Sequence, residues 1–259
     1  MLGGVEPSTL ALVVAIVAFG GVVKGLAGFG YGIAGTALLA TVLDPATAVV
    51  VMILPTLAAN LSLLRELDRA GLRSCLRRFW PYLGAAVVGT LLGMALLDSI
   101  PRRALALALG LLTLGYVTTK QPYLTVPGRA RFDAFCRLPG APVKAVLGLL
   151  SGITFGASNV GVQVVAYLDT LDLDRSTFVG VLAMVLVGVS GVRVAAAFAL
   201  GLYGAGSLSL SVLAVVPGLV GVTLGGAGRT RVPDRYLTAG TLLLLGVVGL
   251  RLTAAGTGV

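Results

Sequence analysis

Two positively charged side chains lie inside apolar stretches of this sequence, where a charge is costly and usually functional. Lys24 opens a glycine-dense stretch in a hydrophobic segment, Lys24-Gly25-Leu26-Ala27-Gly28-Phe29-Gly30-Tyr31-Gly32. Arg193 lies between apolar residues, with no acid within one or two helical turns. An ammonium group and a planar guanidinium group both suit an oxyanion, and the guanidinium can bind it through two hydrogen bonds. Both residues are therefore candidates for contacting an anionic ligand.

Each cation also has a structural interpretation. Lys24 could be a lysine near a helix end whose amine reaches the membrane surface, and Arg193 could cap backbone carbonyls of an interrupted segment. The residues between Thr9 and Lys24 are almost all apolar or small. We therefore expect Lys24 to lie deep in the membrane and favour a functional role for it. For Arg193 both interpretations stay open.

Neutral polar residues accompany the two cations. Ser158, Asn159 and Gln163 lie at a second glycine-rich interruption, and Asn60 and Ser190 occupy matching places in the two halves of the chain. Taken singly, each is better explained as a hydrogen bond between membrane helices. Together with two cations and the N-termini of two interrupted helices, they are typical of an anion site. The predicted substrate-binding residues are Lys24, Gly28, Gly30, Asn60, Ser158, Asn159, Gln163 and Arg193.

The composition excludes several classes of protein. Of the 259 residues, 57% are hydrophobic and 11% charged, whereas soluble domains carry about 25% charged residues. We therefore expect an all-α integral membrane protein. The net charge of +9 fits the excess of Lys and Arg in cytoplasmic loops better than nucleic-acid binding. Histidine is absent from the sequence, and no metal-ligand cluster or nucleophile–base pair is evident. We expect neither an enzyme nor a cofactor or metal site.

Eight hydrophobic segments can be drawn along the chain, and two of them are interrupted by glycines. The interrupted segments cover roughly 8–43 and 143–168, and the others cover 46–64, 79–97, 102–119, 176–200, 208–228 and 234–253. The most polar, proline-rich stretch separates two groups of four segments. The predicted organisation is a first transmembrane repeat at 1–119, a cytoplasmic linker at 120–142 and a second transmembrane repeat at 143–259.

The two halves share sequence. Leu43-Asp44-Pro45-Ala46-Thr47 matches Leu173-Asp174-Arg175-Ser176-Thr177, and Gly89-x-x-x-Gly93 matches Gly221-x-x-x-Gly225. The matches follow in the same order at a nearly constant offset, which indicates a duplication. Interrupted hydrophobic segments in matching places of two halves are the sequence pattern that best predicts a transporter's binding site. The two glycine pairs predict close packing between helices.

The distribution of Lys and Arg favours inverted repeats. If every segment crossed the membrane, each side would carry several cations. If each interrupted segment is instead re-entrant, entering and leaving on one side, only Arg102, Arg103 and Arg251 of the loop cations lie outside, as the positive-inside rule prefers. Each half then has three full crossings, so the halves have opposite orientations, a common arrangement in secondary transporters.

The stretch from Lys24 to Gly32 resembles the first-repeat signature of the TauE/SafE family of membrane transporters. In that signature a small or basic residue precedes G-x-x-G-x-G-x-G. The second copy, Ser151-Gly152 through Tyr167-Leu168, is similar, although Ser158-Asn159-Val160-Gly161 stands where the family often has Gly-Gly-Pro-Pro. The resemblance covers nearly the whole chain. It implies a multi-pass inner-membrane protein that transports sulfite, a sulfonate or another sulfur-containing anion, generally outward.

From the residues and the resemblance together we expect a secondary transporter that exports a small sulfur-containing anion by alternating access. Its partners would be the anion and the lipid bilayer, without nucleic acid, and a homodimer stays open. A transporter or channel for another small anion, such as a carboxylate or halide, would use the same two cations. A non-transporting membrane scaffold would use the glycines for packing alone.

The re-entrant arrangement predicts that both chain termini lie outside the cell and that the linker lies inside. A reporter that is active only in the cytoplasm should therefore give no signal when it is fused after Val259. The same reporter inserted into the linker should be active. A strong cytoplasmic signal after Val259 would contradict the inverted arrangement.

Overall fold

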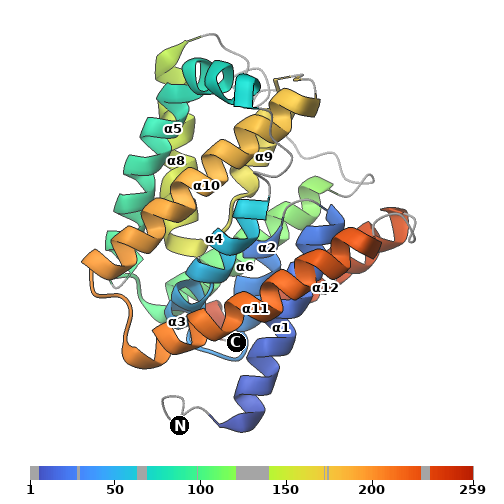
Figure 1. The fold of residues 1–259 in the computed structure, drawn as a ribbon. Coiled ribbons are helices and arrows are strands. Elements are labelled where there is room, and N and C mark those ends of the chain that lie inside the picture. The colour runs from blue at the N-terminus through green and yellow to red at the C-terminus, as the bar shows by residue number, and fades with distance from the viewer. Residues whose placement is uncertain are drawn as a thin grey trace.

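The computed structural model describes residues 6–27, 30–62, 69–97, 99–120, 140–171, 173, 175–228 and 234–258. Every regular element in these ranges is a helix, as the composition predicts (Figure 1). The helices of the first half are α1 (Pro7–Ala27), α2 (Tyr31–Leu39), α3 (Pro45–Val51), α4 (Ile53–Leu61), α5 (Arg69–Leu97) and α6 (Arg102–Lys120). Those of the second half are α8 (Ala141–Ser158), α9 (Val162–Asp169), α10 (Arg175–Ala199), α11 (Ala205–Gly228) and α12 (Asp234–Thr257).

Several of these helices are long and apolar enough to cross a bilayer. In the described part of the chain there are five such spans, namely Pro7–Leu26, Phe79–Leu97, Ala141–Ser158, Gly180–Ala199 and Ala205–Gly228. Pro45–Leu61 and Leu245–Thr257 are shorter apolar stretches. Large apolar side chains on the outside, such as Trp80 at 65% and Leu243 at 74% exposure, suit a surface in contact with lipid. The chain is a multi-pass membrane protein.

Each predicted hydrophobic segment corresponds to a helix or to a pair of helices. The largest departure is α5, which begins at Arg69, so most of the stretch predicted as a loop before Phe79 is helical. Its apolar span still begins at Phe79. Arginine is a good helix former, so a helix can continue past the point where its apolar sequence ends. Within the predicted linker, residues 121–139 lie outside the described residues.

The first interrupted segment is a helical hairpin. α1 ends at Ala27, and Gly30 precedes α2 with a left-handed φ of 92° that favours glycine. α2 then runs back along α1. Gly35 of α2 lies against Gly20 of α1, whereas Gly30, nearer the turn, has Val23 as its neighbour.

The second interrupted segment turns back in a similar way. α8 ends at Ser158, and the next residue, Asn159, has the only positive φ, 61°, of the non-glycine residues that the structure describes. Asparagine tolerates this conformation better than most other residues. On α9, the ring of Tyr167 stacks on Tyr82 of α5 with the centroids 4.8 Å apart. Tyr82 in turn packs against Gly148 in the middle of α8, so α9 returns towards the middle of α8.

The predicted close-packing glycine faces are confirmed. A Cβ atom added at Gly89 or Gly93 of α5 would lie 2.2 Å from a carbonyl oxygen of α8. One added at Gly221 or Gly225 of α11 would lie 2.0 or 2.3 Å from a carbonyl oxygen of α1. Two helix backbones can approach this closely only where side chains are absent.

The helices pair reciprocally between the two halves. α1 packs on α11, while α8, which matches α1 in the sequence, packs on α5, which matches α11. α4 packs on α10, its own match, and α6 packs on α12, its own match. A two-fold relation between the halves would produce this set of pairs.

Replacing Gly93 with alanine should destabilise the protein, because the methyl group would push α5 away from α8. We expect a loss of about 1–3 kcal/mol, as for other overpacked sites, seen as a lower unfolding temperature of the purified protein in detergent. Gly84→Ala on the same helix is the control, because nothing lies within 4 Å of a Cβ atom at Gly84. Equal unfolding temperatures for the two variants would show that the α5–α8 contact does not need glycine.

Candidate anion site

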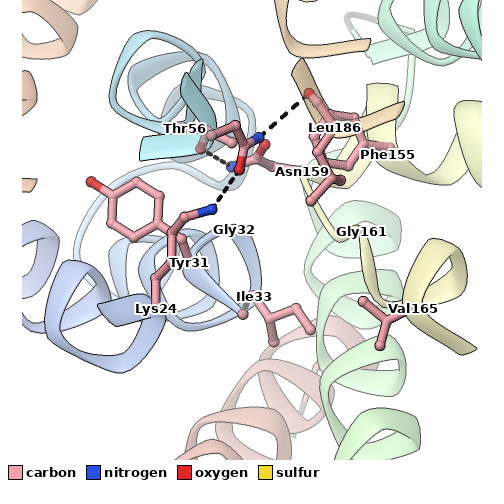
Figure 2. A pocket seen from close by; sticks show the side chains of 12 residues that line it. Lys24, Tyr31, Gly32, Ile33, Thr56, Phe155, Asn159, Gly161, Val165 and Leu186 are labelled. Atoms are coloured by element: carbon pink, nitrogen blue, oxygen red, sulfur yellow. Dashed lines mark hydrogen bonds between the residues drawn. The ribbon is translucent and has the colours of Figure 1, made fainter. Parts of the chain in front are cut away.

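The turns of the two hairpins meet at a cavity (Figure 2). The empty space at this site is about 400 Å³ when its open mouth is included, and the enclosed part is much smaller. Its walls come from both hairpins, from α4 and from α10. The lining residues are Lys24, Gly30, Tyr31, Gly32, Ile33, Thr56, Asn60, Phe155, Asn159, Gly161, Val165 and Leu186.

Gly32 allows the two hairpins to touch. A Cβ atom added at Gly32 would lie 1.9 Å from the backbone oxygen of Asn159. Any side chain at this position of α2 would therefore separate it from the turn between α8 and α9.

Lys24 is buried in the cavity wall, and no acidic residue of the described part of the chain forms an ion pair with it. Its side chain is 3% exposed, and Nζ donates a 2.6 Å hydrogen bond to Oδ1 of Asn60. The one ion pair that the described residues form joins Arg102 to Asp44 and does not involve Lys24. An ammonium group has three donors, and Asn60 uses one. The other two are available to a ligand.

Asn60 also forms hydrogen bonds with the second half of the chain. Its Nδ2 donates to Oγ of Ser190 at 2.9 Å and to the backbone oxygen of Leu186 at 3.4 Å. Because Ser190 and Leu186 both belong to α10, one amide links Lys24 of α1 to the second half.

Arg193 lies behind the cavity wall, not in it. Its side chain is 1% exposed, Nη1 donates to Oδ1 of Asn159, and the guanidinium carbon lies 5.1 Å from the ring centroid of Phe155. Nε and Nη2 have no hydrogen-bond partner in the described part of the chain. Asn159 and Phe155 line the cavity, so they separate Arg193 from it.

Asn159 joins three helices through its side chain. While Oδ1 accepts from Arg193 of α10, Nδ2 donates to Oγ1 of Thr36 at 3.1 Å and to Oγ1 of Thr56 at 2.9 Å. Thr36 lies on α2 and Thr56 on α4. The amide therefore holds the turn of the second hairpin against two helices of the first half.

The N-terminus of α2 opens into the same cavity. The first amide groups of a helix have no acceptor within it, and Gly30, at the N-cap, has no side chain to supply one. Tyr31, Gly32 and Ile33 form this first turn and line the cavity. Backbone N–H groups at a helix N-terminus, with an ammonium group beside them, form a favourable environment for an anion.

The position of α4 depends on a hydroxyl group of α11. Pro55 has no N–H group, so it cannot bond the carbonyl of Val51 four residues earlier. That carbonyl instead accepts a 2.8 Å hydrogen bond from Oγ of Ser211. Hydroxyl side chains commonly satisfy backbone groups that proline frees in membrane helices.

The comparison with protein families assigns the chain. The family model described as "Sulfite exporter TauE/SafE" matches residues 13–252. The chain belongs to this family. The match includes both hairpins and both cations, and it confirms the resemblance seen in the sequence. No curated protein and no solved structure matches the chain. TauE/SafE proteins are membrane transporters, which agrees with the apolar helices of this chain.

Three of the predicted site residues of this TauE/SafE chain are not among the residues that line the cavity, namely Ser158, Gln163 and Arg193. Oγ of Ser158 donates at 2.6 Å to the backbone oxygen of Thr154 on α8. Oε1 of Gln163 is buried without a hydrogen-bond partner among the described residues. Gly28 lies outside the described residues. Lys24, Gly30, Asn60 and Asn159 line the cavity together.

Sequence analysis missed Thr56. It precedes Asn60 by four residues on α4, so both side chains lie on one face of that helix and both line the cavity. The sequence signal that could have pointed to Thr56 is this spacing of two polar residues within an apolar segment. Within the described residues, no group of His, Cys, Asp or Glu could hold a metal ion.

Replacing Gly32 with alanine should separate the two hairpins. We expect a lower unfolding temperature and a loss of transport of about tenfold or more, which corresponds to about 1.4 kcal/mol. Gly191→Ala on α10 is the control, because a Cβ atom there would have no neighbour within 4 Å. Wild-type flux in Gly32→Ala proteoliposomes would show that the hairpin contact is dispensable.

Proposed function

We propose that the chain is a secondary transporter that exports a small sulfur-containing anion, such as sulfite or a sulfonate, across the inner membrane. The observation that carries the proposal is the Lys24 ammonium group, which is buried in the cavity wall and whose one hydrogen-bond partner among the described residues is the neutral Asn60. A buried charge without a counter-charge is costly, and a bound anion would remove that cost. The family assignment supports a sulfur oxyanion as this ligand.

The groups around Lys24 also suit an oxyanion. The open amides of α2 and the remaining Lys24 donors converge on one small cavity, whereas no described carboxylate lines it. A sulfur oxyanion offers several acceptor atoms in a small volume. Such a ligand can accept from several of these donors at once.

We also infer that the two halves are inverted repeats. Reciprocal helix pairing supports this arrangement, and so does the hydrogen bond between Asn60 and Ser190, which hold matching positions in the two halves. Residues at a two-fold axis meet their own counterparts. Each interrupted segment turns back on itself as a hairpin, so both of its ends would lie on the same side of the membrane, although α1 and α8 are each long enough to cross it.

Alternating access follows from this arrangement. The α1–α11 and α5–α8 pairs are held by backbone contacts at glycines, so each pair would move as a unit. The cavity lies between the hairpins, and rocking of the α1–α11 unit against the α5–α8 unit, each of which contains one helix from each half, would open it to either side in turn.

Two other functions remain as alternatives. A transporter or channel for a carboxylate or halide would use the same donors, and a panel of competing anions distinguishes it. A membrane scaffold would not need a buried ammonium group in a cavity, so the position of Lys24 favours transport. A homodimer remains a proposal that cross-linking in the membrane would test.

Replacing Lys24 with methionine should weaken binding of sulfite and ethanesulfonate roughly ten- to a hundredfold, because one charge-assisted hydrogen bond contributes about 1.5–3 kcal/mol. Titration calorimetry on the purified protein and flux in proteoliposomes measure the loss.

Lys144→Met is the matched control for this experiment. Lys144 lies on α8 with its Nζ 5.5 Å from the ring centroid of Phe79 and does not line the cavity, so binding should stay unchanged. Equal binding by the Lys24 and Lys144 variants would favour the scaffold. Tighter binding of acetate or chloride than of either sulfur anion would favour the other transporter.

A further inference from the structure

We infer that Thr56 donates a hydrogen bond directly to the transported anion, and that Arg193 is a positioning residue that prepares this donor through Asn159. The inference rests on the proposed function, because it assumes an anion in the cavity. It follows from which atoms of this network can donate and which can accept.

Arg193 fixes the orientation of the Asn159 amide. A guanidinium group carries N–H donors and no acceptor. The Asn159 atom that faces Nη1 must therefore be the carbonyl oxygen Oδ1, as observed. The amide group Nδ2 then points the other way, towards the two threonines.

This orientation sets the direction of both threonine hydroxyl groups. Nδ2 of Asn159 donates to Oγ1 of Thr36 and to Oγ1 of Thr56. Because an amide NH₂ group only donates, neither threonine can donate to Nδ2, and the proton of each hydroxyl group points elsewhere. Both threonines therefore keep a free donor.

Thr56 does not use this donor within its own helix. Threonines inside helices usually donate to the carbonyl four residues earlier, and Thr90, Thr113 and Thr154 do so here at 2.6–2.8 Å. No such bond from Thr56 is present, although its backbone N–H bonds Met52 normally at 3.0 Å. Its hydroxyl proton is available for another acceptor.

Of the two threonines, only Thr56 lines the cavity. Its oxygen accepts from Asn159 (Figure 2), and Asn60, which bonds Lys24, follows it by one helical turn on α4. Its free proton is thus placed to join the Lys24 donors around one ligand. Thr36 has the same bond to Asn159 but is fully buried outside the cavity.

The class of ligand follows from this chemistry. Lys24, Thr56 and the first turn of α2 all present donors to the cavity. A fully ionised oxyanion such as a sulfonate has only acceptors and fits this lining. A protonated acid would bring a donor of its own against these donors, and the site should reject it.

The matched pair Thr56→Val and Thr36→Val tests the direct contact. Each variant removes one hydroxyl group that accepts from Asn159, but only Thr56→Val removes a group from the cavity. By titration with ethanesulfonate, Thr56→Val should bind roughly ten- to a hundredfold more weakly, as for loss of a hydrogen bond to a charge. Thr36→Val should change binding about twofold at most. Thr56→Ser keeps the hydroxyl group and should restore binding.

The role of Arg193 needs a measurement that mere destabilisation would not affect. Arg193→Gln offers an acceptor oxygen, so the Asn159 amide can reverse and Thr56 can donate to it instead of to the anion. Arg193→Gln should therefore weaken ethanesulfonate binding, and adding Thr56→Val to it should cause little further loss. Arg193→Lys, which carries only donors, should retain most of the affinity. If the losses of affinity caused by the two substitutions multiplied in the double variant, Arg193 would not act through Thr56, and the positioning role would be overturned.

The outcomes separate this inference from the proposed function. Absence of binding of any anion by the wild-type protein would contradict the proposed function. Wild-type binding with equal affinities in Thr56→Val and Thr36→Val would leave the proposed function standing and overturn the Thr56 contact. If Thr56→Val does not fold, Thr56→Ala replaces it, and wild-type affinity in folded Thr56→Ala would overturn the inference.

Discussion

A helix that is interrupted inside a bilayer leaves amide and carbonyl groups that lipid cannot satisfy. Here the two interruptions lie against each other, and the first turn of α2 lines the cavity between them. The carbonyl of Val51, left without a partner by Pro55, accepts a hydrogen bond from the Ser211 hydroxyl of α11. The side chain of Asn159 holds its own turn against three helices. These hydrogen bonds are therefore a requirement of the fold, because the interrupted backbone would be unstable in lipid without them.

The two halves solve the same turn with different residues. Gly30 precedes α2 with a φ of 92°, and Asn159 follows α8 with a φ of 61°; both residue types tolerate a left-handed backbone. The first half contributes the buried cation Lys24, and the second half contributes Arg193, whose guanidinium lies over the ring of Phe155. Of these two cations only Lys24 lines the cavity. In the proposed site, Lys24 would therefore give its charge directly to the ligand, and Arg193 would orient a neutral amide.

Sequence reasoning found the parts of the site that depend on local pattern. Glycine spacing predicted the interruptions and the helix contacts, and an apolar segment around Lys24 predicted its burial. Asn60 was found because it has a counterpart in the second half. The position of Arg193 and the role of Thr56 could not be predicted, because both depend on how α4 and α10 are rotated about their axes. Turning either helix by one residue, about 100°, would bring different side chains to the cavity, and the sequence alone does not fix this rotation.

The hydrogen bonds of the site also link the two units that would move. α4 packs on α11 as well as on α10, whereas α8 and α10 pack on α5. Asn60–Ser190 and Thr56–Asn159 are therefore hydrogen bonds between the side of the molecule that contains α1 and α11 and the side that contains α5 and α8, and rocking of these units must loosen or rearrange them. A typical hydrogen bond contributes only about 0.5–1.5 kcal/mol net, so such bonds can exchange during the motion. A ligand shifts such an equilibrium only by its difference in affinity for the two states. In the proposed site, Lys24 of α1 and Thr56 of α4 would face an anion beside the turn of the second hairpin. An anion that binds them more tightly in one arrangement of the units than in the other would therefore bias the motion.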